Sequence, residues 1–342
     1  MRRSCLCVLA AWWLIVPTVN AAEPASAYHL IKTIKVGGNG GWDYLSLDAA
    51  ARRLYISRGT HVVVLDVDKG KVVGKVADTP GVHGIALVPK LNRGFSSNGR
   101  ESTVTAFDLK TLRETSRIKV GKGPDAIIYD PATGRVFTFN GQGKDATAID
   151  AAKEKVVGSI ELGGKPEFAV ADGKGEVYVN LEDKDKVLAL NARKLTVDHV
   201  WSIAPGKAPS GLAMDRANRR LFVTCHNQKM VILDADSGKV VATPPIGRGT
   251  DACTFDAEAG LAFSSNGDGT LSVVQEKSPD KFTALAPVST QAGARTMALD
   301  TKTHNIFLVT ATPKPVPEGE NPRRFRRSFE PDSFVVLVVG KE

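Results

Sequence analysis

Titratable side chains recur along the chain at one fixed place, five residues before a strand-ending position that is acidic in six of seven copies. We call this set the entry ring, and its members are Asp43, His83, Asp125, Glu167, Ser210, Asp251 and Arg295. A position that serves only the fold would be filled alike in every copy, so the varied set predicts contacts with a ligand at a concave site. The alternative is a solvated rim whose residues vary because nothing constrains them.

A second set of polar residues lies at the end of another predicted strand in each copy. We call it the outer ring, and it consists of Arg58, Asn98, Asn140, Glu182, His226 and Asn266, with an expanded loop after Thr310 in the last copy. In a four-stranded antiparallel unit, the connection into the first strand and the loop after the second strand lie on the same face. We therefore predict that both rings bind a ligand on one face, which we call the funnel face.

Two histidines in these rings raise the possibility of a metal site. His83 and His226 together with nearby carboxylates could hold a divalent ion, because imidazole and carboxylate suit zinc, iron or manganese. No sequence spacing supports this pairing, and the alternative is that each histidine is a hydrogen-bonded rim residue. The sequence requires no cofactor, and the CxxCH motif for covalent haem attachment is absent. The GxSxG motif of a nucleophilic serine is also absent. Catalytic residues are not assigned.

The stretch RRFRR carries a concentrated positive charge. Arg323, Arg324, Arg326 and Arg327 flank Phe325 within a Pro-rich insertion at about 311–330, on a chain with 45 basic and 37 acidic residues. An aromatic side chain among guanidinium groups suits single-stranded nucleic acid or an acidic partner. The alternative is a solvated surface loop.

The elements that must position these residues repeat with a period of about 40. The strand-ending residues are 40 to 44 positions apart: Asp48, Val88, Asp130, Asp172, Asp215, Asp256 and Asp300. Such a period, with several strands in each copy, is typical of a β-propeller. We predict an all-β, seven-bladed propeller of four-stranded antiparallel blades. We expect the strand-ending acids to form turns. A recurring aromatic position is expected to pack in the core, and its residues are Tyr55, Phe95, Phe137, Tyr178, Phe222, Phe263 and Phe307.

The two ends of the chain predict how the ring closes. Phe334 to Gly340 has the form of a third strand with no fourth strand after it, and YHLIKTIKVG near the N-terminus has the form of a fourth strand with nothing before it. Sharing one blade would remove an exposed sheet edge. We therefore expect the N-terminal strand to complete the last blade.

The repeated segments RLYIS, RGFSSN, RVFTFN, EVYVN, RLFVT and LAFSSN, each followed by a VxVxD-like strand, resemble the YVTN repeat. Over essentially its whole mature length the chain resembles the YncE-like, YVTN-repeat β-propeller proteins of bacteria. This resemblance implies the propeller fold and an exported protein, and it makes DNA binding worth testing. It assigns no function, because propellers of this kind differ in what they bind.

The first 21 residues resemble a secretory signal peptide, with Arg2 and Arg3 before an apolar run and Val19-Asn20-Ala21 before Ala22. We expect a single propeller domain over residues 22–342, periplasmic or secreted, without a membrane span in the mature chain, and monomeric. Cys225 and Cys253 remain after cleavage, either as a disulfide or as two buried thiols.

Taken together, these patterns favour an exported binding module that recognises a small ligand or a partner protein through the funnel face, with catalysis not required. The alternatives are a metal-assisted hydrolase of the lactonase kind and nucleic-acid binding through the RRFRR loop.

Overall fold

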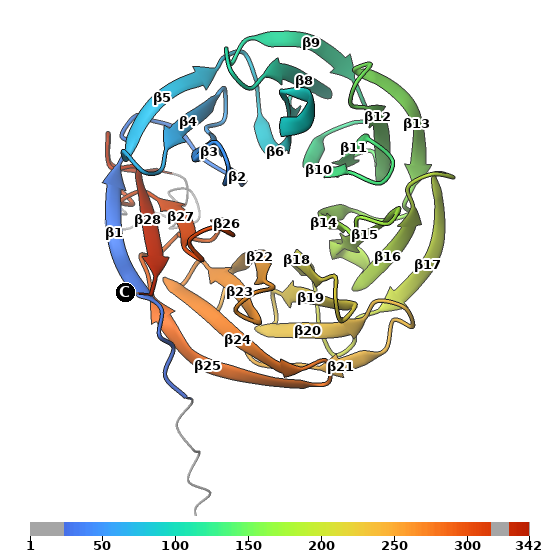
Figure 1. Ribbon diagram of the computed structural model, residues 1–342, viewed down its shortest axis with the longest axis vertical. Helices are drawn as coiled ribbons and strands as arrows, with labels where there is room; N and C mark the ends of the chain where they lie inside the picture. The colour runs from blue at the N-terminus through green and yellow to red at the C-terminus, as the bar shows by residue number, and fades with distance from the viewer. Residues whose placement is uncertain (1–23, 316–327, 342) are drawn as a thin grey trace, which may run out of the picture.

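Seven β-sheets stand around a central axis like the blades of a propeller (Figure 1). The computed structural model describes residues 24–315 and 328–341. In that part of the chain each sheet has four antiparallel strands, and the first strand of each blade lies nearest the axis. The prediction of a seven-bladed, all-β propeller is confirmed.

The first four blades follow one another directly in the sequence. Blade one contains β2 (Leu45–Asp48), β3 (Arg53–Ser57), β4 (Val62–Asp66) and β5 (Lys71–Val76). Blade two contains β6 (Val82–Val88), β7 (Arg93–Asn98), β8 (Thr103–Asp108) and β9 (Glu114–Lys119). Blade three contains β10 (Pro124–Asp130), β11 (Arg135–Asn140), β12 (Asp145–Asp150) and β13 (Lys155–Glu161). Blade four contains β14 (Pro166–Ala171), β15 (Glu176–Leu181), β16 (Lys186–Asn191) and β17 (Thr196–Ser202).

The last three blades complete the ring. Blade five contains β18 (Pro209–Asp215), β19 (Arg220–Cys225), β20 (Lys229–Asp234) and β21 (Val240–Ala242). Blade six contains β22 (Thr250–Asp256), β23 (Leu261–Asn266), β24 (Thr270–Ser278) and β25 (Lys281–Ser289). Blade seven contains β26 (Met297–Leu299), β27 (Ile306–Thr310), β28 (Val335–Gly340) and β1 (His29–Lys35). Two short 3-10 helices, η1 (Pro89–Leu91) and η2 (Glu182–Lys184), lie in connections. No helix in the described ranges is long and apolar enough to cross a membrane.

The closure of the ring agrees with the prediction from the chain ends. β1 pairs antiparallel with β28, from His29 opposite Gly340 to Lys35 opposite Val335. Ile34 is buried in the seam, and Tyr28 packs edge-on against Phe263 with 5.1 Å between ring centroids. The N-terminal strand therefore covers the edge of blade seven.

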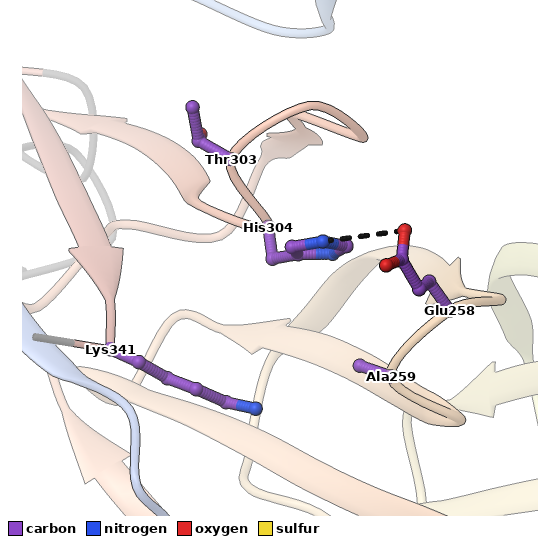
Figure 2. A pocket seen from close by; sticks show the side chains of 5 residues that line it. All are labelled: Glu258, Ala259, Thr303, His304 and Lys341. Carbon is purple, nitrogen blue, oxygen red and sulfur yellow. Dashed lines mark ion pairs between the residues drawn. The ribbon is translucent and has the colours of Figure 1, made fainter.

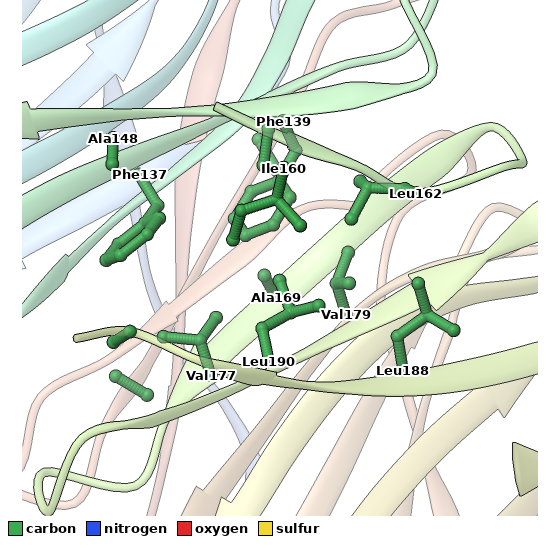
Figure 3. Close-up of a cluster of buried hydrophobic side chains, with 14 of the residues drawn as sticks. Phe137, Phe139, Ala148, Ile160, Leu162, Ala169, Val177, Val179, Leu188 and Leu190 are labelled. Atoms are coloured by element: carbon green, nitrogen blue, oxygen red, sulfur yellow. The ribbon is translucent and has the colours of Figure 1, made fainter. Parts of the chain in front are cut away.

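Apolar side chains fill the space between neighbouring blades. Figure 3 shows this layer between blades three and four, where Phe137 and Phe139 face Ala169, Val177 and Val179. All seven residues of the recurring aromatic position are at most 3% exposed, which confirms their predicted role in core packing. The sequence pattern of these strands therefore serves the contacts between sheets.

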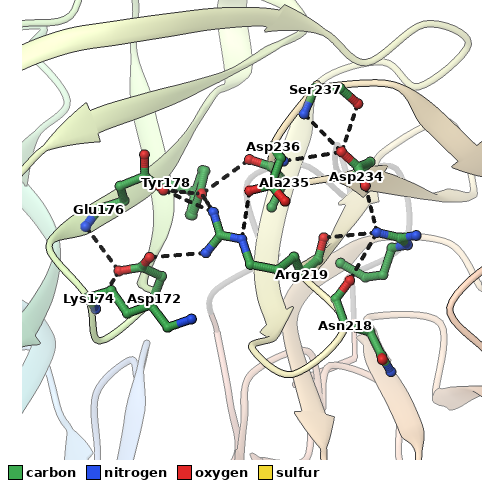
Figure 4. Close-up of polar contacts among 11 residues, drawn as sticks. Asp172, Lys174, Glu176, Tyr178, Asn218, Arg219, Asp234, Ala235, Asp236 and Ser237 are labelled. Carbon is green, nitrogen blue, oxygen red and sulfur yellow. Dashed lines mark hydrogen bonds and ion pairs between the residues drawn. The ribbon is translucent and has the colours of Figure 1, made fainter.

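The strand-ending acids form turns, as predicted, and they also tie adjacent blades together. Asp48 accepts hydrogen bonds from the backbone N–H groups of Ala50 and Ala51, and the other five acids accept equivalent bonds. At Val88, η1 takes the place of the acid turn. Arg219 of blade five donates to Asp172 of blade four at 3.1 Å (Figure 4). Arg52 donates in the same way to Asp300 at 2.7 Å, across the closing seam.

Both cysteines of the described chain are buried and free, so the thiol alternative is the one that the structure supports. The predicted leader lies outside the described residues, as does RRFRR.

Candidate functional site

The entry ring surrounds the central axis at one end, which we call the channel mouth, because each of its residues lies at or just before the start of an innermost strand. Asp43 and Arg295 lie two residues before β2 and β26. His83, Asp125, Glu167, Ser210 and Asp251 are the second residues of their strands. In all five strands the pairing with the next strand shifts register at this point, for example between Val82 and Ile85. Such irregularities release a residue from regular pairing and redirect its side chain, and they are frequent beside functional sites. The fold thus repeats a local device that presents entry-ring side chains.

Three entry-ring residues from consecutive blades meet at one point. Nδ1 of His83 lies 2.6 Å from Oδ2 of Asp43 and 3.6 Å from Oδ1 of Asp125. Burial by itself lowers the pKa of His83, but the hydrogen bond to Asp43 and the charge of Asp125 outweigh this effect and raise that pKa to about 8. Burial raises the pKa of Asp125. The two carboxyl groups therefore favour the protonated form of the His83 imidazole when no other cation is bound between them.

A second group forms around a lysine that the sequence analysis did not select. Lys165 Nζ lies 2.6 Å from Oε1 of Glu167 and 2.5 Å from Oε2 of Glu182. Burial, followed by the charge of Asp125, raises the pKa of Glu167. His226 lies on the far side of Glu182, with 3.8 Å between Nε2 and Oε1. Lys165 stands two positions before an entry-ring residue, and that proximity is the signal that could have identified it.

A third group joins blades five, six and seven. Ser210 is buried and donates to the backbone carbonyl and to Oδ1 of Asp251. Arg295 pairs with the other carboxylate oxygen of Asp251. Burial raises the pKa of Asp251, and the guanidinium of Arg295 opposes that effect. Ser210 therefore positions Asp251, and Arg295 is the most exposed member of this group, with 41% of its side chain exposed against 14% for Asp251.

Two aromatic residues from different blades meet next to these groups. Tyr44 of blade one stacks on Phe168 of blade four, with 4.4 Å between ring centroids and 28° between planes. The Tyr44 hydroxyl is buried and has no hydrogen-bond partner. Burial and the surrounding carboxylates of Asp125, Glu167, Asp43 and Asp251 raise its pKa well above the usual value. The sequence analysis missed both residues, although each directly follows an entry-ring acid.

The structure corrects part of the outer ring. Asn98, Asn140 and Asn266 are fully buried, and each amide nitrogen donates to hydroxyl groups of the neighbouring strand, as Asn98 does to Thr105 at 2.8 Å. These asparagines brace the blade interior, so they do not line a ligand site. Their strand-end position suggested exposure, but each side chain points inward.

Arg58 is also a correction to the outer ring. Its side chain is buried, it lies 3.6 Å above the Phe334 ring, and it donates to the backbone carbonyl of Asn39. Burial lowers the pKa of Arg58 to about 10. Of the outer ring, Glu182 and His226 remain at the mouth.

The proposed pairing of His83 and His226 in one metal site is not supported. Within the described residues, the group whose ligand atoms all lie within 4.8 Å of one another is Asp43, His83 and Asp125. His226 instead contacts the lysine-centred group. The four arginines of the RRFRR loop lie outside the described residues.

Two cavities lie away from the entry ring. One of about 390 Å³ is lined by Glu258, Ala259, Thr303, His304 and Lys341, on turns of the opposite face (Figure 2). Another of about 330 Å³ lies beside the blade-seven insertion and is lined in part by Gly38, Asn39, Phe329 and Phe334. Nδ1 of His304 lies 2.8 Å from Oδ2 of Asp256, at the position where Arg52 and Arg219 tie other blades. The first cavity therefore borders a structural contact between blades. We favour the entry ring as the site because the titratable groups converge there.

Comparison with known proteins supports the fold alone. No protein-family model and no curated protein matches this chain. The chain is similar to a solved structure of Kuenenia stuttgartiensis hydrazine synthase, with 15% identity, a TM-score of 0.71, and coverage of 80% of this chain and 94% of the other. It is also similar to the RRP9 WD40 repeats, with 7% identity, a TM-score of 0.76, and coverage of 93% and 99%. A chain of the mitotic checkpoint complex matches with 13% identity, a TM-score of 0.71, and coverage of 90% and 95%.

Proposed function

We propose that this protein is an exported binding module that holds a small polar ligand, or a charged segment of a partner protein, at the entry ring. The observation that carries the proposal is the concentration of four carboxyl groups at one channel mouth, those of Asp43, Asp125, Glu167 and Asp251. Burial raises the pKa of the last three. Holding such groups together costs stability at neutral pH, and perturbed groups of this kind gather at functional sites.

The charges at the mouth are arranged to accept a partner. The cations of His83, Lys165 and Arg295 each face carboxylates. Their side chains are 38%, 42% and 41% exposed, respectively. A ligand with both positive and negative groups can therefore replace these internal pairs without leaving a charge unpaired. The stacked rings of Tyr44 and Phe168 lie next to these groups and offer apolar surface to the body of such a ligand.

The test is a thermal-shift screen of the mature protein against amino compounds, carboxylates, sugar lactones and short oligonucleotides. A ligand that binds only the folded state adds about 2.7 kcal/mol to the free energy of unfolding at a hundred times its Kd. The shift should disappear in Glu167→Gln and persist in Glu161→Gln, an exposed glutamate of β13. A shift that survives substitution of Glu167 and of Asp251 alike would place the ligand elsewhere and refute the proposal.

Export forms part of the proposal and rests on the leader. Expression of the full chain in a bacterial host with separation of periplasm from cytoplasm should yield a mature protein that begins at Ala22. An intact leader on cytoplasmic protein would contradict it. The likeness of the repeats to YncE-like proteins supports export. In the thermal-shift screen, binding of a sugar lactone would favour a lactonase role, and binding of an oligonucleotide would favour a DNA-binding role.

A further inference from the structure

We propose that Asp43, His83 and Asp125 form a binding site for a divalent transition-metal ion, such as zinc or manganese, at the channel mouth. The inference deepens the proposed function and rests on it, since it names the first ligand of the entry ring. The donor set of one imidazole and two carboxylates suits these ions.

The spacing of the ligand atoms fits one ion. Ligands about 2.1 Å from a tetrahedral zinc ion lie about 3.4 Å from one another. Nδ1 of His83 is already 3.6 Å from Oδ1 of Asp125. Its distance to Oδ2 of Asp43 is 2.6 Å, a hydrogen bond, so insertion of an ion would widen this contact by about 0.8 Å. A small rotation of either side chain provides that movement.

The backbone fixes which nitrogen of His83 faces the carboxylates. A methyl group added to Gly99 would lie 2.9 Å from Nε2 and Cδ2 of His83, so this edge of the ring packs against the backbone of the next loop. Nδ1 is left facing Asp43 and Asp125. The three ligands come from blades one, two and three. His83 and Asp125 lie on strands β6 and β10, which hold a metal ligand more accurately than a loop does, and Asp43 lies two residues before β2.

The charge and the hydroxyl next to the site are consistent with a bound cation. Two carboxylates balance the charge of a divalent ion. Tyr44 directly follows Asp43 in the chain, and its buried hydroxyl has no hydrogen-bond partner. The charges of Asp125, Glu167, Asp43 and Asp251 all act on this hydroxyl, with that of Asp125 the strongest. A buried donor without an acceptor is costly, and an oxygen atom of a ligand or solvent molecule on the ion could accept a hydrogen bond from it.

His304 shows why the arrangement at His83 is distinctive. His304 also lies between two carboxylates, but its Nδ1 contacts Asp256 at 2.8 Å and its Nε2 contacts Glu258 at 3.6 Å. The two carboxylates therefore lie at different nitrogens of the ring (Figure 2 draws the Glu258 contact) and do not converge with one nitrogen on one ion. At His83, both carboxylates approach the same nitrogen.

The experiment is calorimetric titration of zinc and manganese into tag-free mature protein stripped with a chelator, with the visible spectrum of added cobalt as a second readout. We expect one ion per chain. His83→Gln and Asp125→Asn should each weaken binding by more than the roughly 10–100-fold that loss of a residue supporting a metal ligand costs. His304→Gln, the matched histidine control, should bind as tightly as the parent. The melting curve checks that each variant is folded, and Asp125→Asn, which is nearly isosteric, serves if His83→Gln does not fold.

Absence of binding, or equal affinity in the parent, Asp125→Asn and His83→Gln, would overturn the metal site. If an organic ligand still gave a thermal shift that depends on Glu167, the metal inference alone would fail. If neither metal nor organic ligand bound, the proposed function would fail with it.

Discussion

Glu276 in β24 should make the protein less stable as the pH rises from acid to neutral. Its Oε1 accepts a hydrogen bond from Asn218 at 3.1 Å, whereas its Oε2 is buried and receives no hydrogen bond from a donor. The Asp215 carboxyl group is near enough to share a proton with Glu276. Burial, followed by the charge of Asp215, raises the pKa of Glu276 from 4.5 to about 7. The folded protein therefore retains a proton that the unfolded chain releases between about pH 4.5 and 7.

The sign and size of the effect follow from proton linkage. Over this range the unfolded state binds fewer protons than the folded state, so the free energy of unfolding falls with pH and levels off above about pH 7. A shift from 4.5 to about 7 corresponds to at most about 3.4 kcal/mol. Because the side chain is partly solvated, screening reduces this to about 1–2 kcal/mol.

Glu276→Gln replaces the carboxyl group with a neutral one of the same shape. Urea unfolding at about pH 4 and pH 8 should show equal stability at pH 4 and a variant about 1–2 kcal/mol more stable than the parent at pH 8. The exposed Glu161→Gln serves as the control for general charge effects. A difference between parent and Glu276→Gln that does not change with pH, or a variant that is less stable at pH 8, would refute the reasoning.

Three further predictions concern the frame that carries the site. A chain that begins at Gly37 loses β1 and the buried Ile34 and Tyr28, so its free energy of unfolding should fall by at least about 4 kcal/mol in urea unfolding. A chain that begins at Pro24 keeps the backbone hydrogen bond from Ala286 to Pro24 and should match the parent. Equal midpoints would show that the clasp is dispensable. Arg219→Ala removes the contacts to Asp172, Glu176 and Asp236 and should lower the free energy of unfolding by about 2–3 kcal/mol, measured by thermal unfolding. The control Arg193→Ala, at an exposed arginine, should lower it by less than about 0.5 kcal/mol. Similar losses in the two variants would argue against a stabilising contact between blades at Arg219. Burial raises the pKa of both Cys225 and Cys253, so neither should react with a thiol reagent in the native mature protein, and both should react after unfolding. Reaction of the unfolded protein only after a disulfide reductant is added would contradict the free-thiol state.

Features that depend on residues close together in the chain could be predicted from the sequence. The period of about 40 and the alternation within each strand predicted seven blades, because each blade is one local unit that must bury both faces against its neighbours. The acid turns were predictable for the same reason: Asp48 bonds to the amides two and three residues later. The closure of the ring was also predictable from the sequence, because the incomplete units at the two chain ends together make one four-stranded blade.

The composition of the site was decided by the tertiary structure. The entry ring could be listed from the sequence, but which members touch depends on packing between blades: His83 meets Asp43 and Asp125, 40 and 42 positions away, and not His226. The inward direction of Asn98 and the stacking of Tyr44 on Phe168 across the channel likewise depend on contacts between strands and blades. The repeat sets where each strand lies, whereas the direction of a side chain at a register shift and its partners across the axis are set by the closed ring.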